Sequence, residues 1–215
     1  MKRLTALLIC LAALLALLAG CSGGEKVTIT NFVGEWENKY EMSEGEVPEM
    51  LTYFGFSDEE QKFIDEKLFY LVQIFAVSED GSYRFFISGE RSLAALREGF
   101  SNVLRALYDK RQYLTDLYGE DVLEMDFDKF CEGYAWIYEM DSVDEYLDAV
   151  TDEMKEFYSL DEDLELERGT MTVEKDRLAM TVEGESQAER LGYTFGEQSL
   201  LLTYADGEEL YSRVK

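Results

Sequence analysis

The sequence predicts an α+β protein: an antiparallel β-barrel of about eight strands, with a three-helix insertion between the third and fourth strands. Two observations lead to this fold class. Residues 31–88 and 163–215 contain short apolar and alternating runs bounded by turn signals, as strands require. In residues 89–162, apolar residues recur at three- and four-residue steps, as amphipathic helices require. Sequential strands with tight turns favour a closed barrel, because sheet edges need cover; the alternative is an open β-sandwich without a cavity.

The first part of the barrel is predicted to contain three strands. Residues 31–42 form the first, which begins around Gly34 and Trp36. A long connection follows, with a short helix over residues 57–66 that starts at a capping box of Ser57 and Glu60. Residues 68–77 and 82–88 then form a hairpin around the turn EDGS. Because residues 68–77 are apolar on both faces, the helical insertion is expected to cover the outer face.

Three helices are predicted in the insertion, over residues 92–118, 126–139 and 143–158. The first helix is rich in Arg and Lys, whereas residues 120–165 hold 18 Asp or Glu against two Lys. We therefore expect the basic helix to lie against the acidic ones, with a contribution from each exposed ion pair of only about 0–1 kcal/mol.

In the second part of the barrel, apolar and polar residues again alternate with a period of two, as in a strand. GTMTVEKDRLAMTVEG, residues 169–184, reads as a hairpin, and RLGYTFGEQSLLLTY, residues 190–204, as two further strands around Gly196. The dipeptide Asp206-Gly207 is a strong turn signal and leads into a last strand that ends near Arg213.

The chain begins with a pattern typical of export. Lys2 and Arg3 precede an uncharged, mostly apolar run, which ends in the small residues before Cys21. The sequence LAGC closely resembles a bacterial lipobox. That resemblance implies that residues 1–20 are a lipoprotein signal peptide, that residues 21–30 are a lipidated Cys21 and its tether, and that the protein is lipid-anchored on the extracytoplasmic face of a bacterial membrane. The alternative, a plain transmembrane anchor, needs about 20 apolar residues and fits less well.

Charge and composition exclude several classes of partner. Loss of Lys2 and Arg3 with the leader takes the net charge from −26 to −28. Such a surface repels nucleic-acid phosphates and anionic lipid headgroups, so we expect no nucleic-acid partner and membrane contact only through the lipid at Cys21. After cleavage and lipidation Cys131 is the remaining thiol, so no intramolecular disulfide forms, and its apolar helix face predicts a buried, inert side chain.

Candidate catalytic groups are scarce. The chain has no histidine, which removes the usual general base and His-assisted nucleophiles, and it carries no recognisable nucleophile, phosphate-binding or metal-binding motif. The acidic stretch LDEDLE at residues 160–165 is either a weak calcium loop or, in the simpler interpretation, a solvated loop. We therefore predict a non-enzymatic protein without a cofactor or metal.

The strand segments resemble the lipocalin-like barrels found in many bacterial lipoproteins. The resemblance rests on Gly34-Glu35-Trp36, on GTMTVEKDRLAMT, and on YTFGEQSLLLTYADGEELYSRV at the end of the chain. In that family the Trp of the first strand closes one end of the barrel and packs on an Arg near the last strand. The resemblance thus implies that Trp36 packs on Arg213 and closes the barrel floor.

Three functions are compatible with this fold. The first is a carrier of a small apolar ligand, with the helical insertion as a lid and an aromatic-lined pocket. The second is an interaction module that docks an envelope protein on the insertion, where CEGYAWIYEM supplies aromatics. The third is an unrecognised enzyme with carboxylates clustered in a cleft. Candidate pocket residues, which in the simpler interpretation only fill the core, are Tyr40, Phe69, Phe75, Phe86, Met171, Met180, Tyr193 and Phe195.

Overall fold

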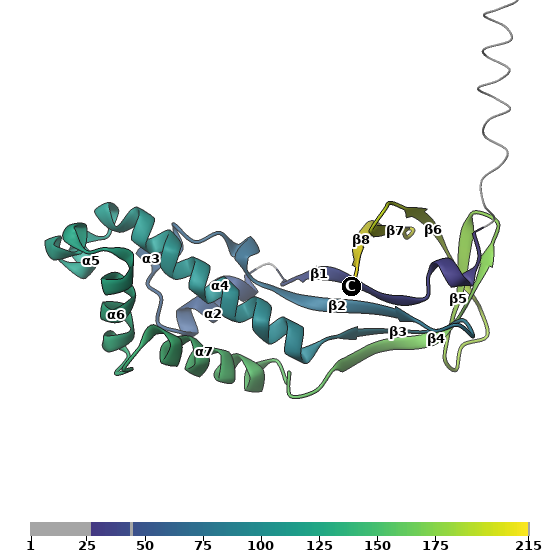
Figure 1. Cartoon of the computed structure of the whole chain (residues 1–215), viewed down its shortest axis with the longest axis horizontal. Helices are drawn as coiled ribbons and strands as arrows, with labels where there is room; N and C mark the ends of the chain where they lie inside the picture. The colour runs from purple at the N-terminus through teal and green to yellow at the C-terminus, as the bar shows by residue number, and fades with distance from the viewer. Residues whose placement is uncertain (1–26, 44, 215) are drawn as a thin grey trace, which may run out of the picture.

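A computed structural model describes residues 27–43 and 45–214 of the 215-residue chain. The molecule is elongated, with a β-barrel at one end and a bundle of helices at the other (Figure 1). The predicted signal peptide, residues 1–20, and the predicted lipidation site, Cys21, lie outside the described residues.

Eight antiparallel strands close into a barrel in chain order, so the predicted barrel is confirmed and the open sandwich is wrong. Strand β1 pairs with β8 through Trp36↔Arg213 and Glu37↔Ser212, and this short contact closes the sheet. The strands are β1 (Gly34–Glu41), β2 (Tyr70–Val77), β3 (Ser82–Ile87), β4 (Leu164–Glu174), β5 (Arg177–Val182), β6 (Glu189–Phe195), β7 (Ser199–Thr203) and β8 (Glu208–Arg213).

Within the described residues, helices lie between β3 and β4, as predicted, and two shorter α-helices lie between β1 and β2. The α-helices are α2 (Glu46–Tyr53), α3 (Asp58–Gln61), α4 (Gly89–Lys110), α5 (Thr115–Tyr118), α6 (Phe127–Ile137) and α7 (Val143–Phe157). The 3-10 turns are η1 (Ile29–Asn31), η2 (Glu66–Leu68), η3 (Arg111–Tyr113) and η4 (Glu120–Glu124).

Several element boundaries differ from the sequence prediction. The first strand begins at Gly34 rather than residue 31, because η1 turns the chain and buries Phe32 in the barrel. The helix predicted over 57–66 keeps its Ser57–Glu60 capping box but ends at Gln61, since Asp65 caps the next turn, η2. The helix predicted over 92–118 ends at Lys110, where η3 and α5 bend the chain and bury Leu114.

Helix α4 covers the outer face of β2 and β3, as the two-sided apolar pattern of residues 68–77 predicts. Val72, Ile74 and Phe86 form a buried cluster with Ala95 of α4. The hydroxyl of Ser92 on α4 accepts a hydrogen bond from the backbone N–H of Val72 at 2.9 Å, which fixes the helix on the strand.

The expected contact between the basic helix and an acidic one is also confirmed. Arg97 of α4 pairs with Asp144 and Asp148 of α7, with both N–O distances at 3.0 Å. Apolar side chains of α2, α4, α6 and α7 form one buried core inside the helical bundle, separate from the barrel core.

Candidate functional site

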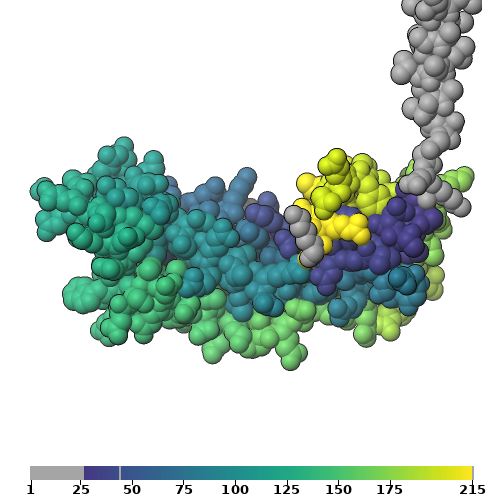
Figure 2. All heavy atoms as spheres, viewed as in Figure 1, coloured from purple at the N-terminus to yellow at the C-terminus, as the bar shows by residue number. Residues whose placement is uncertain are grey.

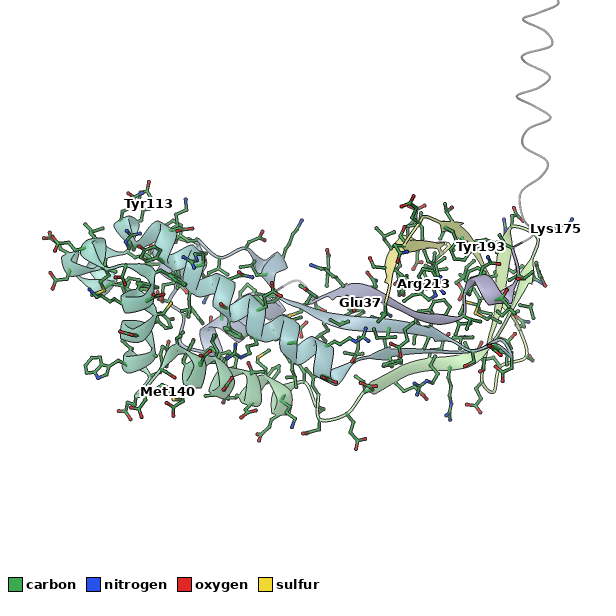
Figure 3. All side chains as sticks on the ribbon, viewed as in Figure 1. Glu37, Tyr113, Met140, Lys175, Tyr193 and Arg213 are labelled. Carbon is green, nitrogen blue, oxygen red and sulfur yellow. The ribbon has the colours of Figure 1, made fainter. Side chains whose placement is uncertain are left out.

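One end of the barrel is closed by Trp36. Its ring is only 2 % exposed, and its indole N–H donates a hydrogen bond to the carbonyl of Phe32 at 2.7 Å. The structure brings Arg213, which is labelled in Figure 3, to this ring. Its guanidinium carbon lies 5.1 Å from the ring centroid, and the guanidinium also donates to the carbonyl of Val33. A cation over an indole contributes about 0.5–2 kcal/mol, so this contact fastens the barrel floor.

Above the floor, apolar side chains fill the barrel interior. Phe75 and Phe85 stack with ring centroids 4.5 Å apart, and Tyr211 packs beside both. The buried members of this barrel core are Phe32, Trp36, Phe75, Val77, Tyr83, Phe85, Met171, Leu178, Met180, Leu191, Leu200, Leu202 and Tyr211. The middle of the barrel is therefore a packed core.

The eight candidate pocket residues do not line one pocket. Phe75, Met171 and Met180 belong to the packed barrel core, and Tyr193 and Phe195 contact Phe32 near the floor.

The other three candidates lie outside the barrel interior. Phe86 faces α4 on the outer side of the sheet, Phe69 is part of the helical core, and Tyr40 is 47 % exposed. Core filling is thus the main role of the buried members, and an aromatic-lined pocket made by this set is not what the structure contains.

The opposite end of the barrel is its mouth, and there the inward positions become polar. In a strand, side chains alternate between the two faces, so residues two apart point the same way. Gln73 precedes the inward Phe75 by two residues, Glu189 precedes Leu191, and Glu209 precedes Tyr211. Glu167 is in phase with Met171 on β4. Because even-numbered strands run in one direction, these four polar side chains meet at the same end of the barrel.

A cavity of about 220 Å³ lies at this mouth. Its apolar walls come mainly from β3, β5 and β6, and its polar groups from β2, β4, β6 and β8. The lining residues are Gln73, Tyr83, Phe85, Leu166, Glu167, Met180, Val182, Glu189, Leu191, Tyr204 and Glu209. Neither Lys nor Arg is among them, so the fixed charges that line the cavity are all negative.

Buried tyrosines hold two of the three carboxylates. The Tyr83 hydroxyl donates to Glu167 at 2.6 Å, and the Tyr211 hydroxyl lies 2.6 Å from Glu209 and 3.0 Å from the Gln73 side-chain oxygen. Burial, and then the neighbouring carboxylate, raises the pKa of Tyr83 well above its usual range. Its hydroxyl therefore remains protonated, and able to donate to Glu167, even in alkaline solution.

The mouth is open to solvent at its rim, where the lining residue Glu189 is exposed. Strands β1 and β2 continue to pair up to Glu41↔Tyr70, past the point where β8 leaves β1. The chain passes from β3 into α4 and from α7 into β4 on this side of the barrel. The space-filling view shows a dip between the helical end and strands β7 and β8 (Figure 2).

Other candidate groups can be placed as well. Burial raises the pKa of the Cys131 thiol to about 11, so this thiol is protonated at neutral pH. Among the described residues, no three His, Cys, Asp or Glu side chains gather closely enough to hold a metal ion. In CEGYAWIYEM, Tyr134 and Ala135 are buried, whereas Trp136 is 78 % exposed.

Sequence reasoning missed the polar ring at the mouth, although a signal was present. The buried side chains of Met171, Leu191 and Tyr211 point into the barrel. Counting back from them in steps of two residues along each strand predicts inward positions for Glu167, Glu189 and Glu209. In a chain with so many Asp and Glu, that spacing is the feature which assigns these three to the lining of one cavity.

The fold and this site define an antiparallel β-barrel protein with a closed floor, an acidic open mouth and a helical insertion. Comparisons with known proteins find no matching family model, no similar curated protein and no similar solved structure. None of the described helices combines the length and apolar character needed to cross a membrane.

Proposed function

We propose that this protein is a lipid-anchored extracytoplasmic lipoprotein whose lipocalin-like barrel binds a small organic cation with an apolar body at its mouth. The closed barrel, with one end open to solvent, is a property of the fold. The lipid anchor and the ligand are the proposed parts. The observation that carries the ligand is the pairing of apolar walls with an all-acidic set of charges in one cavity.

The chemistry of the mouth selects the ligand class. A protonated amine or similar cation pairs with the carboxylates of Glu167, Glu189 and Glu209, while an apolar body packs on Phe85, Met180 and neighbouring side chains. The strongly negative net charge attracts cations from a distance and repels anions, fatty acids included. The sequence predicts an apolar ligand, and the charge of the mouth narrows that ligand to an amphiphile with a cationic group and an apolar body.

The size of the cavity narrows the class further. Pockets for drug-sized ligands measure roughly 300–1,000 Å³, and the mouth is smaller than that. The packed core beneath it leaves room for a compact molecule at the rim and none for a long chain threaded through the barrel.

The anchor would place this mouth away from the membrane. Val27 and Ile29 pack against the barrel core at the floor end. The six peptide steps from Cys21 to Val27 span at most about 20 Å. A lipid on Cys21 would therefore keep the floor near the bilayer and direct both the mouth and the helices into the space beyond it.

Binding rather than catalysis is the role we assign to the carboxylates. Glu167 and Glu209 accept hydrogen bonds from buried tyrosines, which suits fixed recognition groups, and the chain has no histidine to act as a proton carrier.

Calorimetry on the soluble chain, residues 22–215, tests this proposal with phenethylamine, phenethyl alcohol and phenylpropionate as matched probes. The amine should bind best, the alcohol more weakly, and the carboxylate not at all. Replacing Glu167 and Glu209 by Gln should weaken amine binding at least about tenfold, since each contact is charge-assisted. Glu197→Gln, an exposed position in the turn after β6, is the control. Equal binding of the amine and the alcohol would contradict the assignment.

A further inference from the structure

A second surface with binding character lies on the helical bundle, away from the barrel. Two neighbouring hollows of about 230 and 260 Å³ share Tyr53 and Phe54. Their lining follows one face of α7 at helical spacing, with Tyr146, Val150, Glu153, Met154 and Phe157, and α2 forms the other wall. We call this the α7 groove; from residue 146 to 157 it is roughly 16 Å long at 1.5 Å per residue.

Large aromatic side chains at the α7 groove are exposed and yet held in place. Tyr53 is 61 % exposed and Phe157 is 64 % exposed, and their ring centroids are 6.3 Å apart. Tyr53 also contacts Phe54 edge-on, and its hydroxyl donates to Glu153. Rings that are already positioned lose little freedom when a partner binds, which is typical of interface anchors.

Methionines add adaptability to the groove. Met50 and Met154 lie in the wall of the first hollow, and Met140 lines the second. Their flexible, polarisable side chains adjust to different apolar shapes, and methionine is frequent on surfaces that receive amphipathic helices.

The charge at the groove specifies the occupant. Its charged lining residues are Glu46, Glu49 and Glu153, with no Lys or Arg. None of the salt bridges found in the described part of the chain involves these three. Arg97 of α4 pairs instead with Asp144 and Asp148 on α7, so the basic helix leaves the charge at the groove unneutralised.

We propose that the α7 groove docks a basic amphipathic helix of a partner protein. Two neighbouring apolar side chains of that helix occupy the hollows on either side of Tyr53, and its Lys or Arg residues pair with Glu49 and Glu153. This assignment rests on the groove alone and is independent of the ligand proposed for the barrel mouth. It overlaps the docking surface expected from the sequence only in part: Tyr138 and Met140 of CEGYAWIYEM line the second hollow, whereas Trp136 and Ile137 lie outside the groove.

The test uses the full mature chain with Cys21→Ser, which keeps it in solution, and a labelled 14-residue helical peptide of Leu and Lys as the probe. Leucines are placed along one face, and a peptide with Glu in place of Lys is the charge control. Fluorescence anisotropy should show saturable binding of the Lys peptide and none of the Glu peptide.

Variants then locate the binding. Tyr53→Ala with Phe157→Ala should weaken the Lys peptide at least about tenfold, as anchor truncation does, whereas Trp136→Ala should leave it unchanged. Glu49→Gln with Glu153→Gln should weaken it more than Glu124→Gln with Glu132→Gln, which changes the net charge equally at exposed positions elsewhere. Circular dichroism shows that each variant is folded.

The contrary outcomes are equally clear. An equal loss of affinity for the Lys peptide in the two double Glu→Gln variants would mean general attraction to an acidic protein. An unchanged affinity in the Tyr53→Ala, Phe157→Ala variant would mean that the peptide binds elsewhere. Either result overturns the proposal. Neither result bears on phenethylamine at the barrel mouth, so the two proposals can fail separately.

Discussion

At the scale of single residues, buried tyrosines connect stability and recognition in this chain. Tyr83 and Tyr211 lie in the barrel, and Tyr134 and Tyr146 lie in the helical core. Burial is the first cause that raises the pKa of each of them, with neighbouring carboxylates or hydroxyls adding to it. The folded protein therefore keeps these hydroxyls protonated above the pH at which an exposed tyrosine ionises.

The raised tyrosine pKa values predict that the folded protein loses stability in alkaline solution. As pH rises through the ordinary tyrosine value of about 10, the unfolded chain releases protons that the folded chain retains. The contribution to the free energy of unfolding is complete below pH 10 and is lost above it. Urea unfolding at pH 8 and at pH 11 should show this loss.

Tyr146→Phe removes one such hydroxyl and should reduce the loss, whereas Tyr113→Phe, at an exposed position, is the control for general charge effects. The same alkaline loss in both variants would contradict this account of Tyr146.

At the scale of elements, a glycine allows helix α4 to approach the backbone of η2 closely. Gly99 on α4 faces η2, and a Cβ there would lie 2.8 Å from the carbonyl oxygen of Leu68 and 2.9 Å from the Phe69 ring. Gly133 on α6 has open space around the same position. Both glycines are in helix interiors, so each lowers helix stability by a similar amount. Only Gly99 also permits a close contact, the one between α4 and η2.

Replacing each by alanine should separate these effects. Gly99→Ala should lower the free energy of unfolding by about 1–3 kcal/mol, because the contact between α4 and η2 is overpacked. Gly133→Ala should raise it by about 0.5–1 kcal/mol through better helix propensity. Chemical unfolding measures both, and a stabilising Gly99→Ala would show that the interface with η2 yields easily.

The elements also show what the sequence could predict. Alternation and the Asp206-Gly207 turn indicate the strands, and a barrel is favoured over an open sandwich because sheet edges need cover. Helix α2 escaped prediction because Pro48 lies within it, although proline is tolerated in a first turn. The break after Lys110 escaped because apolar spacing continues unchanged through η3 and α5.

The candidate site was harder to predict than the fold. An aromatic residue in a strand looks the same in sequence whether it faces the barrel, α4 or solvent, as Phe75, Phe86 and Tyr40 do. Trp36 and Arg213 were placed by family resemblance, and the structure brings them together. The acidic mouth forms because the glutamates lie at strand ends that meet at the same end of the barrel. Which strand ends meet is known only once the strand directions and the closure of the barrel are known.

At the scale of the whole molecule, the barrel and the helical bundle lie at opposite ends of one long axis (Figure 1). The proposed anchor precedes the barrel in the chain. The floor, fastened by Trp36, lies at the end where the described chain begins. The mouth and the α7 groove lie farther along, and both have acidic charged linings. One chain would thus present a small-cation site and a docking site for a basic helix to the same compartment.

Native mass spectrometry of residues 22–215, taken directly from a mild purification, shows whether the barrel mouth holds a small organic cation. We predict an added small mass that disappears on denaturation, is extracted as a protonatable amine, and is much reduced when Glu167 and Glu209 are both replaced by Gln. An added mass that persists equally in that double variant, or an extracted molecule that is an anion, would contradict the account.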